Sequence, residues 1–283
     1  MNNMTCHQGI EQEGCGQSAM KRFACLVIAG FLLAGFTVMP ASAAILADFE
    51  APGYSLGNLN DQNGWVTSNM SVVEGGLTYA QGSVIHGGGA QHVERVGGGT
   101  ARTHLPLDFE IKPGETVYFS FLYRHALNAA NFAWFAFSDT SANDNNSIGA
   151  IVDHSTGQFG ARVRDNSTNT NDLTGILGTT GEVFLVVGKI EYNLAGQDTI
   201  SVLINPTSTL EPESWHASAS RTLNKNPLNT LWMRAGDAGG DRDFDEIRFG
   251  DSFQAVVIPE PGTLALLLLA GAGVLASGIR RRR

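Results

Sequence analysis

Cysteine is absent from most of this sequence. Its three cysteines, Cys6, Cys15 and Cys25, all lie within the first 25 of 283 residues. The long remainder can therefore form neither an internal disulfide framework nor a thiolate metal site. Its stability must come from buried apolar surface, from hydrogen bonds or from a bound ion.

Basic residues are scarce as well. Residues 44–257, which we call the central segment, hold 12 of the 18 lysines and arginines and 24 of the 27 aspartates and glutamates, a net charge of −12. A surface of this charge repels a phosphate backbone, so nucleic acid is not an expected partner. Cations are attracted to it instead.

Helical periodicity and long apolar runs are missing from the central segment. Short runs rich in β-branched and aromatic residues alternate with turn residues, which is typical of a sandwich or barrel. Its 214 residues suit one such domain. The strongest predicted strands are 116–124, 132–138, 148–152, 159–164, 182–192, 199–205, 230–234 and 244–249, with shorter ones at 45–50, 65–67, 77–80, 92–96 and 103–105. Residues 206–221 are expected to form one irregular surface loop.

In two of these strands the pattern of apolar residues indicates which faces are buried. A period of two places Val117, Phe119, Phe121 and Tyr123 on one face of strand 116–124. Strand 132–138 (FAWFAFS) is apolar on both faces, so we expect both to be buried.

The N-terminal residues have the features of a secretory signal helix. Two basic residues at 21 and 22 precede an apolar stretch at 23–38, and Ala41-Ser42-Ala43 forms an A-x-A cleavage site. Export would use the Sec translocon, and cleavage after Ala43 would leave a mature chain that begins at Ala44. A signal helix begins close to its basic residues, so translation is expected to start at Met20, with residues 1–19 not translated. A long n-region is the alternative.

One long apolar run lies near the C-terminus. Residues 263–279 form 17 uncharged positions, at the short end of the roughly 17–25 residues that span a bilayer as a helix. A soluble core helix would be polar on one side, and this run is apolar all round. The stiff, extended tripeptide Pro259-Glu260-Pro261 precedes it. Four arginines follow it: Arg280, Arg281, Arg282 and Arg283. Basic residues stay in the cytoplasm, so the sequence predicts a transmembrane helix with its tail inside.

This order of parts, over residues 258–283, resembles the PEP-CTERM sorting signal of Gram-negative bacteria. The resemblance implies recognition by an exosortase, a membrane transpeptidase-like protease that acts near the Pro-Glu-Pro and passes the protein outward. It implies a precursor anchored in the inner membrane, at least transiently. The processed form would then belong to the cell surface or the extracellular matrix, in association with exopolysaccharide and biofilm.

The central segment has a resemblance of its own. The stretch DFEAPGYSLGNLNDQNGW (48–65) resembles the opening of concanavalin A/laminin-G-like jelly rolls fused to such tails. Residues 198–206 (DTISVLINP) and 243–249 (DFDEIRF) resemble their late strands. The resemblance implies an all-β jelly-roll sandwich of two antiparallel sheets, with the first and last strands adjacent. Related jelly rolls bind glycans or cleave them.

An acidic cluster at 241–246 (DRDFDE) is the candidate site for catalysis or metal binding. Asp243 and Asp245 share a strand face, roughly 6–7 Å apart, and paired carboxylates can hydrolyse a glycosidic bond. Laminarinase-type glycanases of the resembled fold carry Glu-x-Asp-x-x-Glu, which we do not find, so the sequence favours a non-catalytic protein. A calcium site is the better functional interpretation, because Asp48 and Glu50 would supply further oxygen ligands if the terminal strands pair. A solvated acidic edge that blocks aggregation is the equal alternative.

Aromatic and histidine side chains complete the candidates. Apolar sugar faces stack on exposed aromatic rings, and Trp215, in the polar loop, could supply one; a loop-packing role is the alternative. Trp65, Trp134 and Trp232 lie in strand-like runs and are expected in the core. The histidines lack metal-site spacing and are expected at the surface or with satisfied partners. The sequence thus predicts an exported, non-catalytic, polysaccharide-binding sandwich, with a glycan-cleaving enzyme and a protein-binding adhesin as alternatives.

Overall fold

The computed structural model describes residues 44–87, 89–96, 100–125, 132–166, 168–236 and 242–258, all of them within one compact unit. The predicted signal peptide with its cleavage site, the Pro-Glu-Pro tripeptide, the apolar run and the terminal arginines lie outside the described residues. Within the described residues, no helix combines the length and the apolar character needed to cross a membrane.

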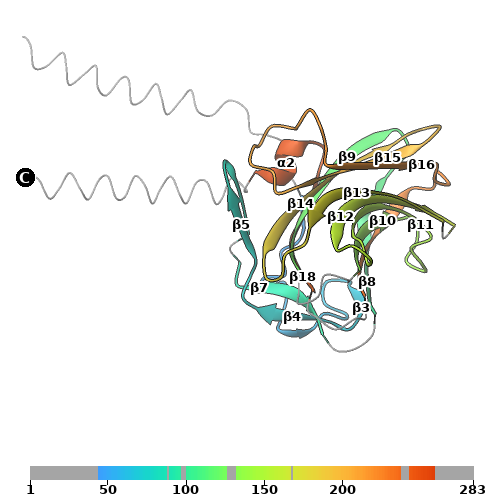
Figure 1. Ribbon diagram of the computed structural model, residues 1–283. Coiled ribbons are helices and arrows are strands. Elements are labelled where there is room, and N and C mark those ends of the chain that lie inside the picture. Colours follow the sequence, from blue (N-terminus) through green and yellow to red (C-terminus); the bar gives the residue numbers. More distant parts are fainter. Residues whose placement is uncertain are drawn as a thin grey trace, which may run out of the picture. The chain divides into compact units, whose positions relative to one another are not determined.

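Two antiparallel sheets make up the domain (Figure 1). The nine-stranded sheet runs β16 (Ala217–Arg221), β15 (Asp198–Ile204), β14 (Val183–Tyr192), β9 (Glu115–His125), β18 (Arg242–Gly250), β7 (Gln91–Arg95), β4 (Met70–Glu74) and β2 (Gly57–Asn58), with β1 (Ala44–Ala47) also on β18. The seven-stranded sheet runs β13 (Thr168–Leu177), β12 (Gln158–Asp165), β11 (Asn146–Val152), β10 (Ala133–Ser138), β17 (Leu228–Ala235), β8 (Ala101–Ile111) and β3 (Val66–Ser68). The all-β jelly-roll sandwich is confirmed, and so is the pairing of its first and last strands.

The core lies between the two sheets and follows the period of two. Val117, Phe119, Phe121 and Tyr123 of β9 all face it, as predicted. From the other sheet Phe135 of β10 stacks on two of these rings, with centroids 4.2 Å from Phe121 and 5.2 Å from Phe119. Full burial of one such side chain stabilises the fold by about 1.5–3 kcal/mol. The alternate positions of β10 are buried too, as predicted, and they face away from the core.

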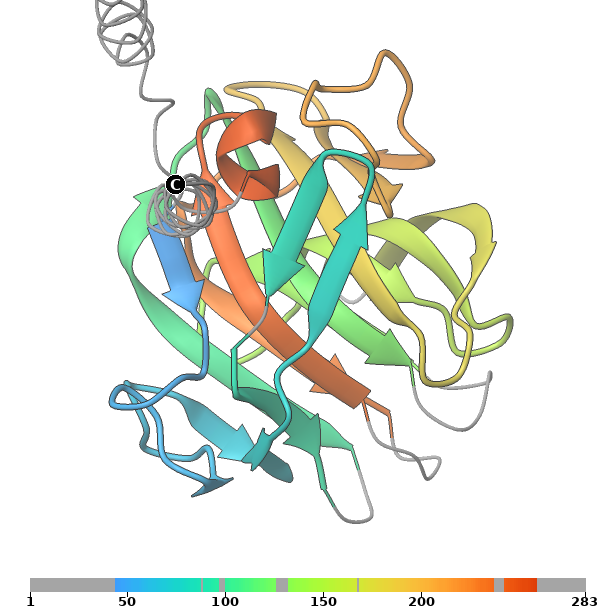
Figure 2. The ribbon, with the colours of Figure 1, turned by 90° about the vertical axis from the view of Figure 1, so that its left-hand side faces the viewer.

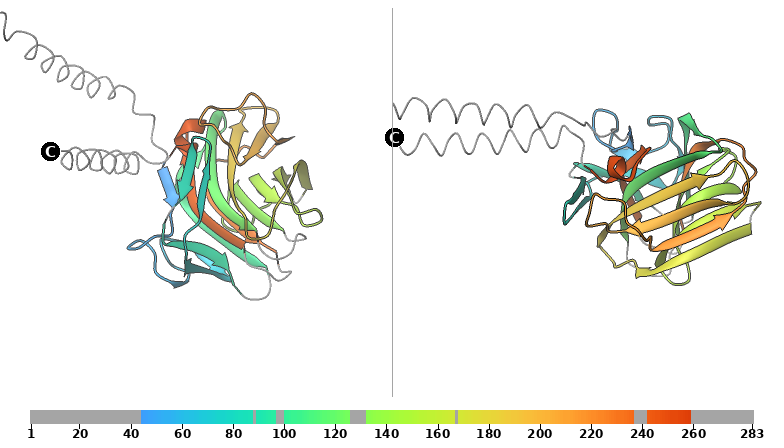
Figure 3. Two further views of the ribbon diagram at one scale, coloured as in Figure 1. Left: turned by 60° about the vertical axis from the view of Figure 1, so that its left-hand side comes forward. Right: turned by 90° about the horizontal axis from the view of Figure 1, so that it is seen from above.

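The outer face of the nine-stranded sheet is covered. The hairpin of β5 (Thr78–Gln81) and β6 (Val84–Gly87) and the short helix α2 (Phe253–Val257) lie over it (Figure 2). Together they enclose a second apolar cluster around Leu122 of β9 and Leu185 of β14. The seven-stranded sheet lies on the other side of the sandwich, and its outer face has no described helix or strand over it (Figures 1 and 3).

Several elements differ from the sequence prediction, which also lacked the short strands β2, β4 and β6. Strand β13 was not predicted, because its sequence TNTNDLTGIL is polar and it joins β12 through backbone pairing while most of its side chains stay in solvent. The loop predicted over 206–221 is wrong at its end, where β16 pairs with β15. The helix α2 was not expected, and its five residues are too few to show a helical period.

Candidate functional site

The outer face of the seven-stranded sheet carries three arginines, one aspartate and a buried tryptophan. No described helix or strand covers this face. The register places Trp134 of β10 opposite Arg234 of β17 on one side and Ile151 of β11 on the other. On β12, Arg162 and Arg164 alternate with core-facing Ala161 and Val163, so both arginines point to this outer face. We call Arg162, Arg164, Arg234, Asp144 and Trp134 the arginine face.

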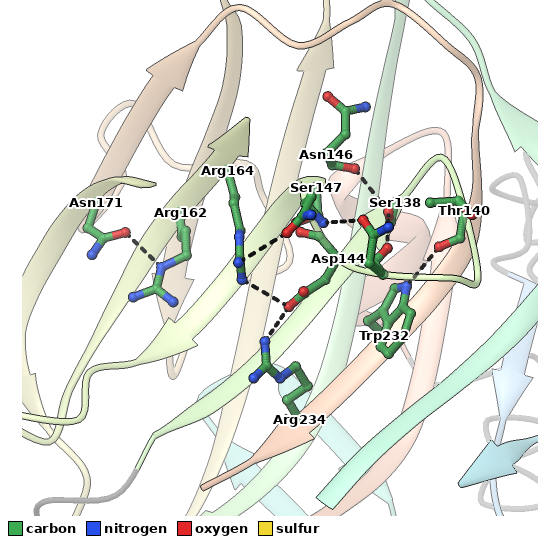
Figure 4. A network of polar contacts seen from close by, with 12 residues as sticks. Ser138, Thr140, Asp144, Asn146, Ser147, Arg162, Arg164, Asn171, Trp232 and Arg234 are labelled. Carbon is green, nitrogen blue, oxygen red and sulfur yellow. Dashed lines mark hydrogen bonds and ion pairs between the residues drawn. The ribbon is translucent and has the colours of Figure 1, made fainter. Parts of the chain in front are cut away.

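Asp144 links two of the arginines (Figure 4). It lies in the loop between β10 and β11, and its Oδ2 accepts hydrogen bonds from Nη1 of Arg234 at 2.5 Å and Nη1 of Arg164 at 3.3 Å. The loop is fixed in turn, because Ser147 Oγ donates to the Asp144 carbonyl at 2.6 Å. Charge-assisted hydrogen bonds of this kind are the strong ones, so the geometry of the face is set before any ligand arrives.

Arg162 is held differently. Its Nε donates to Asn171 Oδ1 on β13 at 2.7 Å, and its guanidinium lies 4.5 Å from the ring centroid of Trp134 and 5.2 Å from that of Phe132. Among the described residues no carboxylate forms an ion pair with it. Burial first, and then the charges of Arg164 and Arg234, lower the pKa of Arg162 to about 10 against the opposing effect of Asp153 and Asp144. It remains a cation at neutral pH.

The aromatic residues form the floor of this face. Trp134 is only 1% exposed, because the guanidinium groups of Arg162 and Arg164 cover its ring, and its Nε1 has no hydrogen-bond partner among the described residues. Trp232 of β17 is 6% exposed, donates from Nε1 to the Thr140 carbonyl at 3.1 Å and packs against His104. The prediction that both tryptophans are buried is confirmed, although both lie on the outer face of the sheet and outside the main core. Trp65 is buried in that core, as predicted.

A groove of about 650 Å³ adjoins the face beyond Trp232. Thr140 and Thr230 line it together with three acidic residues, Asp108, Glu110 and Asp139, and one lysine, Lys112. The outer face is therefore basic around Trp134 and acidic at the groove.

The four predicted calcium ligands are engaged separately. Asp48 Oδ1 accepts from the Glu50 backbone, and Glu50 Oε1 accepts from the Gln91 backbone at 2.8 Å. Asp243 Oδ2 accepts from Arg124 Nε at 2.5 Å, while Asp245 Oδ2 accepts from the Leu77 backbone at 2.9 Å, beneath the β5–β6 hairpin. Pairing of β1 with β18 brings their strands together as expected, but each carboxylate has a partner of its own. The calcium site stays a prediction.

One other group of possible metal ligands occurs among the described residues. Donor atoms of His92, Glu94 and Asp243 lie within 4.8 Å of one another. Arg124 already supplies a positive charge there, because it contacts both Asp243 and, at 3.3 Å, His92 Nε2. Burial first, and then the charge of Arg124, lower the pKa of His92. Arg124 and Asp243 thus form an ion pair beside a neutral histidine, and Glu94 adds a second carboxylate to the cluster.

Trp215, the predicted ligand contact, packs against α2. Its ring lies edge-on to Phe253 with centroids 6.0 Å apart, in the second apolar cluster on the opposite side of the sandwich from the arginine face. This is the loop-packing role that the sequence left open. His86, His92 and His125 are each at most 2% exposed, and polar groups lie beside them, such as Arg124 at His92 and the Tyr123 hydroxyl at His125.

Sequence analysis did not find the arginine face. The available signal was the pair Arg162 and Arg164 at strand spacing in a segment where arginine is scarce. Arg234 and Asp144 join them only through the order of strands in the sheet, which no local pattern shows.

The chain leaves the domain at a fixed point. Ser252 caps α2, whose residues Phe253, Val256 and Val257 are buried. The Val256 carbonyl accepts from Ser120 Oγ at 2.7 Å, and the Ile258 carbonyl accepts from Arg248 Nη1 at 2.8 Å.

Residues 257–283 match the family model of the PEP-CTERM protein-sorting motif. The chain carries a PEP-CTERM sorting motif. The expectation from the sequence is confirmed on this point, and the PEP-CTERM motif marks an exported protein that an exosortase sorts.

The similarity of this chain to solved structures concerns the fold alone. No curated protein matches the sequence. Among solved structures, an endo-β-1,4-glucuronan lyase from the fungus Trichoderma reesei is similar at 11% identity and a TM-score of 0.43, over 74% of this chain and 96% of its own. A carbohydrate binding module from Bacillus subtilis is similar at 11% identity and a TM-score of 0.42, over 67% and 96%. A pseudo β-1,3-glucanase of Mycobacterium tuberculosis is similar at 13% identity and 0.44, over 74% and 99%. Likeness at this level assigns no ligand.

Proposed function

We propose that this protein is an exosortase-processed component of the cell surface or extracellular matrix whose sandwich binds a glycan without cleaving it. The observation that supports the binding role is the arginine face. Fixed donors and an aromatic floor are gathered on a sheet face with no described element over it, whereas the opposite outer face is sealed by α2 and the β5–β6 hairpin. Ligand-binding sites combine aromatic side chains with a small number of convergent polar or charged groups.

Two observations favour binding over cleavage. Asp243 and Asp245, the carboxylate pair that sequence suggested for catalysis, are at most 2% exposed and are covered, so a polysaccharide cannot reach them. On the arginine face, Asp144 is already bound by two guanidinium groups. Hydrolysis needs two carboxyl groups placed on either side of the glycosidic bond. Calcium is not part of the proposal. The transient anchoring in the inner membrane and the association with biofilm are predictions that rest on the sorting motif alone.

The test is a titration of the full chain, purified in detergent, against a panel of bacterial and plant polysaccharides. We expect a dissociation constant near 1 mM, about −4 kcal/mol, and no release of reducing sugar. Arg234→Gln should abolish binding. Lys189→Gln, which removes one positive charge from the other side of the sandwich, should leave it unchanged. Cleavage of any polymer in the panel would favour the enzyme alternative, and binding only to a protein partner would favour the adhesin.

A further inference from the structure

The arginine face carries more positive than negative charge, and a neutral sugar would not compensate the excess. The central segment has a net charge of −12, yet three guanidinium groups lie here with two carboxylates, Asp144, which pairs with Arg164 and Arg234, and Asp153, whose charge acts on Arg162. Arg162, which is 8% exposed, has no ion pair among the described residues. Burial of a cation costs free energy unless an anion compensates it.

The shape of the face also disfavours a neutral sugar. Neutral saccharides bind by laying an apolar ring face on an exposed aromatic side chain. Trp134 cannot offer that surface, because Arg162 and Arg164 lie over its ring with guanidinium carbons 4.5 and 5.8 Å from its centroid. An incoming ligand meets the N–H groups of the arginines before it meets the indole.

Carboxylates are the groups that fit planar guanidinium donors, because both are flat and can form two parallel hydrogen bonds. Arg162 and Arg164 lie two residues apart on one strand, roughly 7 Å, so successive acidic groups on one polymer could reach both. The acidic groove beyond Trp232 would repel such a polymer, which confines its carboxylates to the basic part of the face.

The geometry points to a saccharide that carries carboxylate groups, a polyuronate, as the ligand of Arg162, Arg164 and Arg234. This inference rests on the proposed function, since it names the chemical class of the glycan. The uronate carboxylate takes the place that an aspartate would fill beside Arg162. Arg164 and Arg234 keep Asp144 as their shared partner, Arg164 also keeps Asn145, and both offer their remaining Nη–H groups to the ligand.

The experiment titrates the full chain in detergent with three probes. These are an oligomer of galacturonic acid, the same oligomer after chemical reduction of its carboxyl groups, and poly-glutamate of matched charge. We expect the galacturonate oligomer to bind, with an affinity that falls as salt rises. Carboxyl reduction should weaken binding about tenfold or more, as expected for loss of a charge-assisted hydrogen bond. Poly-glutamate should bind at least tenfold more weakly than the galacturonate oligomer.

Variants separate this inference from a purely structural role. Arg162→Gln should lose about tenfold in affinity for galacturonate, and a cooperative unfolding transition of the variant checks that the fold is retained. Arg162→Lys should retain part of the affinity, and Lys189→Gln all of it. Equal binding of the reduced oligomer overturns the inference but keeps the proposed glycan binding. Equal binding of poly-glutamate overturns the saccharide class, and no binding to any glycan of either panel overturns both proposals.

Discussion

At the scale of single residues, the fold is distinguished by charged groups buried with specific partners. Asp144 with its two arginines on one outer face and Asp245 beneath the hairpin on the other are the clearest cases. In both, a carboxylate holds parts of the chain that are distant in sequence. Each of these two carboxylates leads to a prediction that a single substitution tests.

Asp144→Ala should lower the free energy of unfolding by about 1–3 kcal/mol, because Arg164 and Arg234 then lose their shared acceptor while remaining largely buried. Denaturant unfolding measures the change. Glu110→Gln is the control, since that carboxylate is well exposed and its nearest lysine is 3.9 Å away; it should alter stability little. If the two variants unfold alike, Asp144 does not organise the face.

Asp245 predicts a pH dependence. Burial, opposed by hydrogen bonds from the Leu77 and Glu246 backbone, raises its pKa from 3.8 to about 8. The folded protein therefore holds this proton more tightly than the unfolded chain does. The stability that the proton contributes is complete below about pH 4, is lost as the pH rises toward 8 and is absent above it.

Asp245→Asn, which cannot ionise, should remove that component. The difference in unfolding free energy between wild type and variant, measured by denaturant titration from pH 4 to pH 9, should move in favour of the variant as the pH rises. A difference that stays constant over this range would show that Asp245 is not protonated in the folded protein.

At the scale of elements, burial decides what the sequence could reveal. Strand β9 was predicted because its apolar residues follow a period of two and end in the core, and β10 because it is apolar on both faces, which are both buried. Strand β13 was not, because backbone pairing to β12 needs no apolar side chain. The arginine face was missed for the related reason that its parts come from β10, β12, β17 and a loop, and only the sheet order places them together.

The helix α2 shows how much a short element can contribute through packing. Phe253→Ala should destabilise the protein by about 3–5 kcal/mol, the cost of emptying a buried aromatic site, because this ring fills the cluster beneath Trp215. Gln254→Ala, at the neighbouring exposed position, should change stability by less than about 0.5 kcal/mol. Thermal and denaturant melts of the pair measure both. Equal stability would mean that α2 only rests on the sheet.

At the scale of the whole molecule, the sorting motif makes the prediction. In a host with an exosortase, intact-mass measurement of the released protein should find residues 263–283 absent. Replacement of Pro259, Glu260 and Pro261 by alanine should leave the full-length form in the inner membrane, and deletion of the four terminal arginines should impair processing. A released protein that retains the apolar run would show that the tail is a plain anchor.

The hydrogen bond from Arg248 to the Ile258 carbonyl fixes the chain at Ile258. It therefore limits how far from the domain the processing enzyme can cut. Three residues extend by at most about 11 Å, so a cut within Pro259–Pro261 has to be made within that distance of the folded surface. An enzyme that works this close is obstructed by the domain and must fit beside α2 and the β5–β6 hairpin. The new C-terminus remains on that side after the cut. The arginine face lies on the opposite outer side of the sandwich from α2. If the new C-terminus is joined to another molecule, the arginine face is therefore directed away from that molecule.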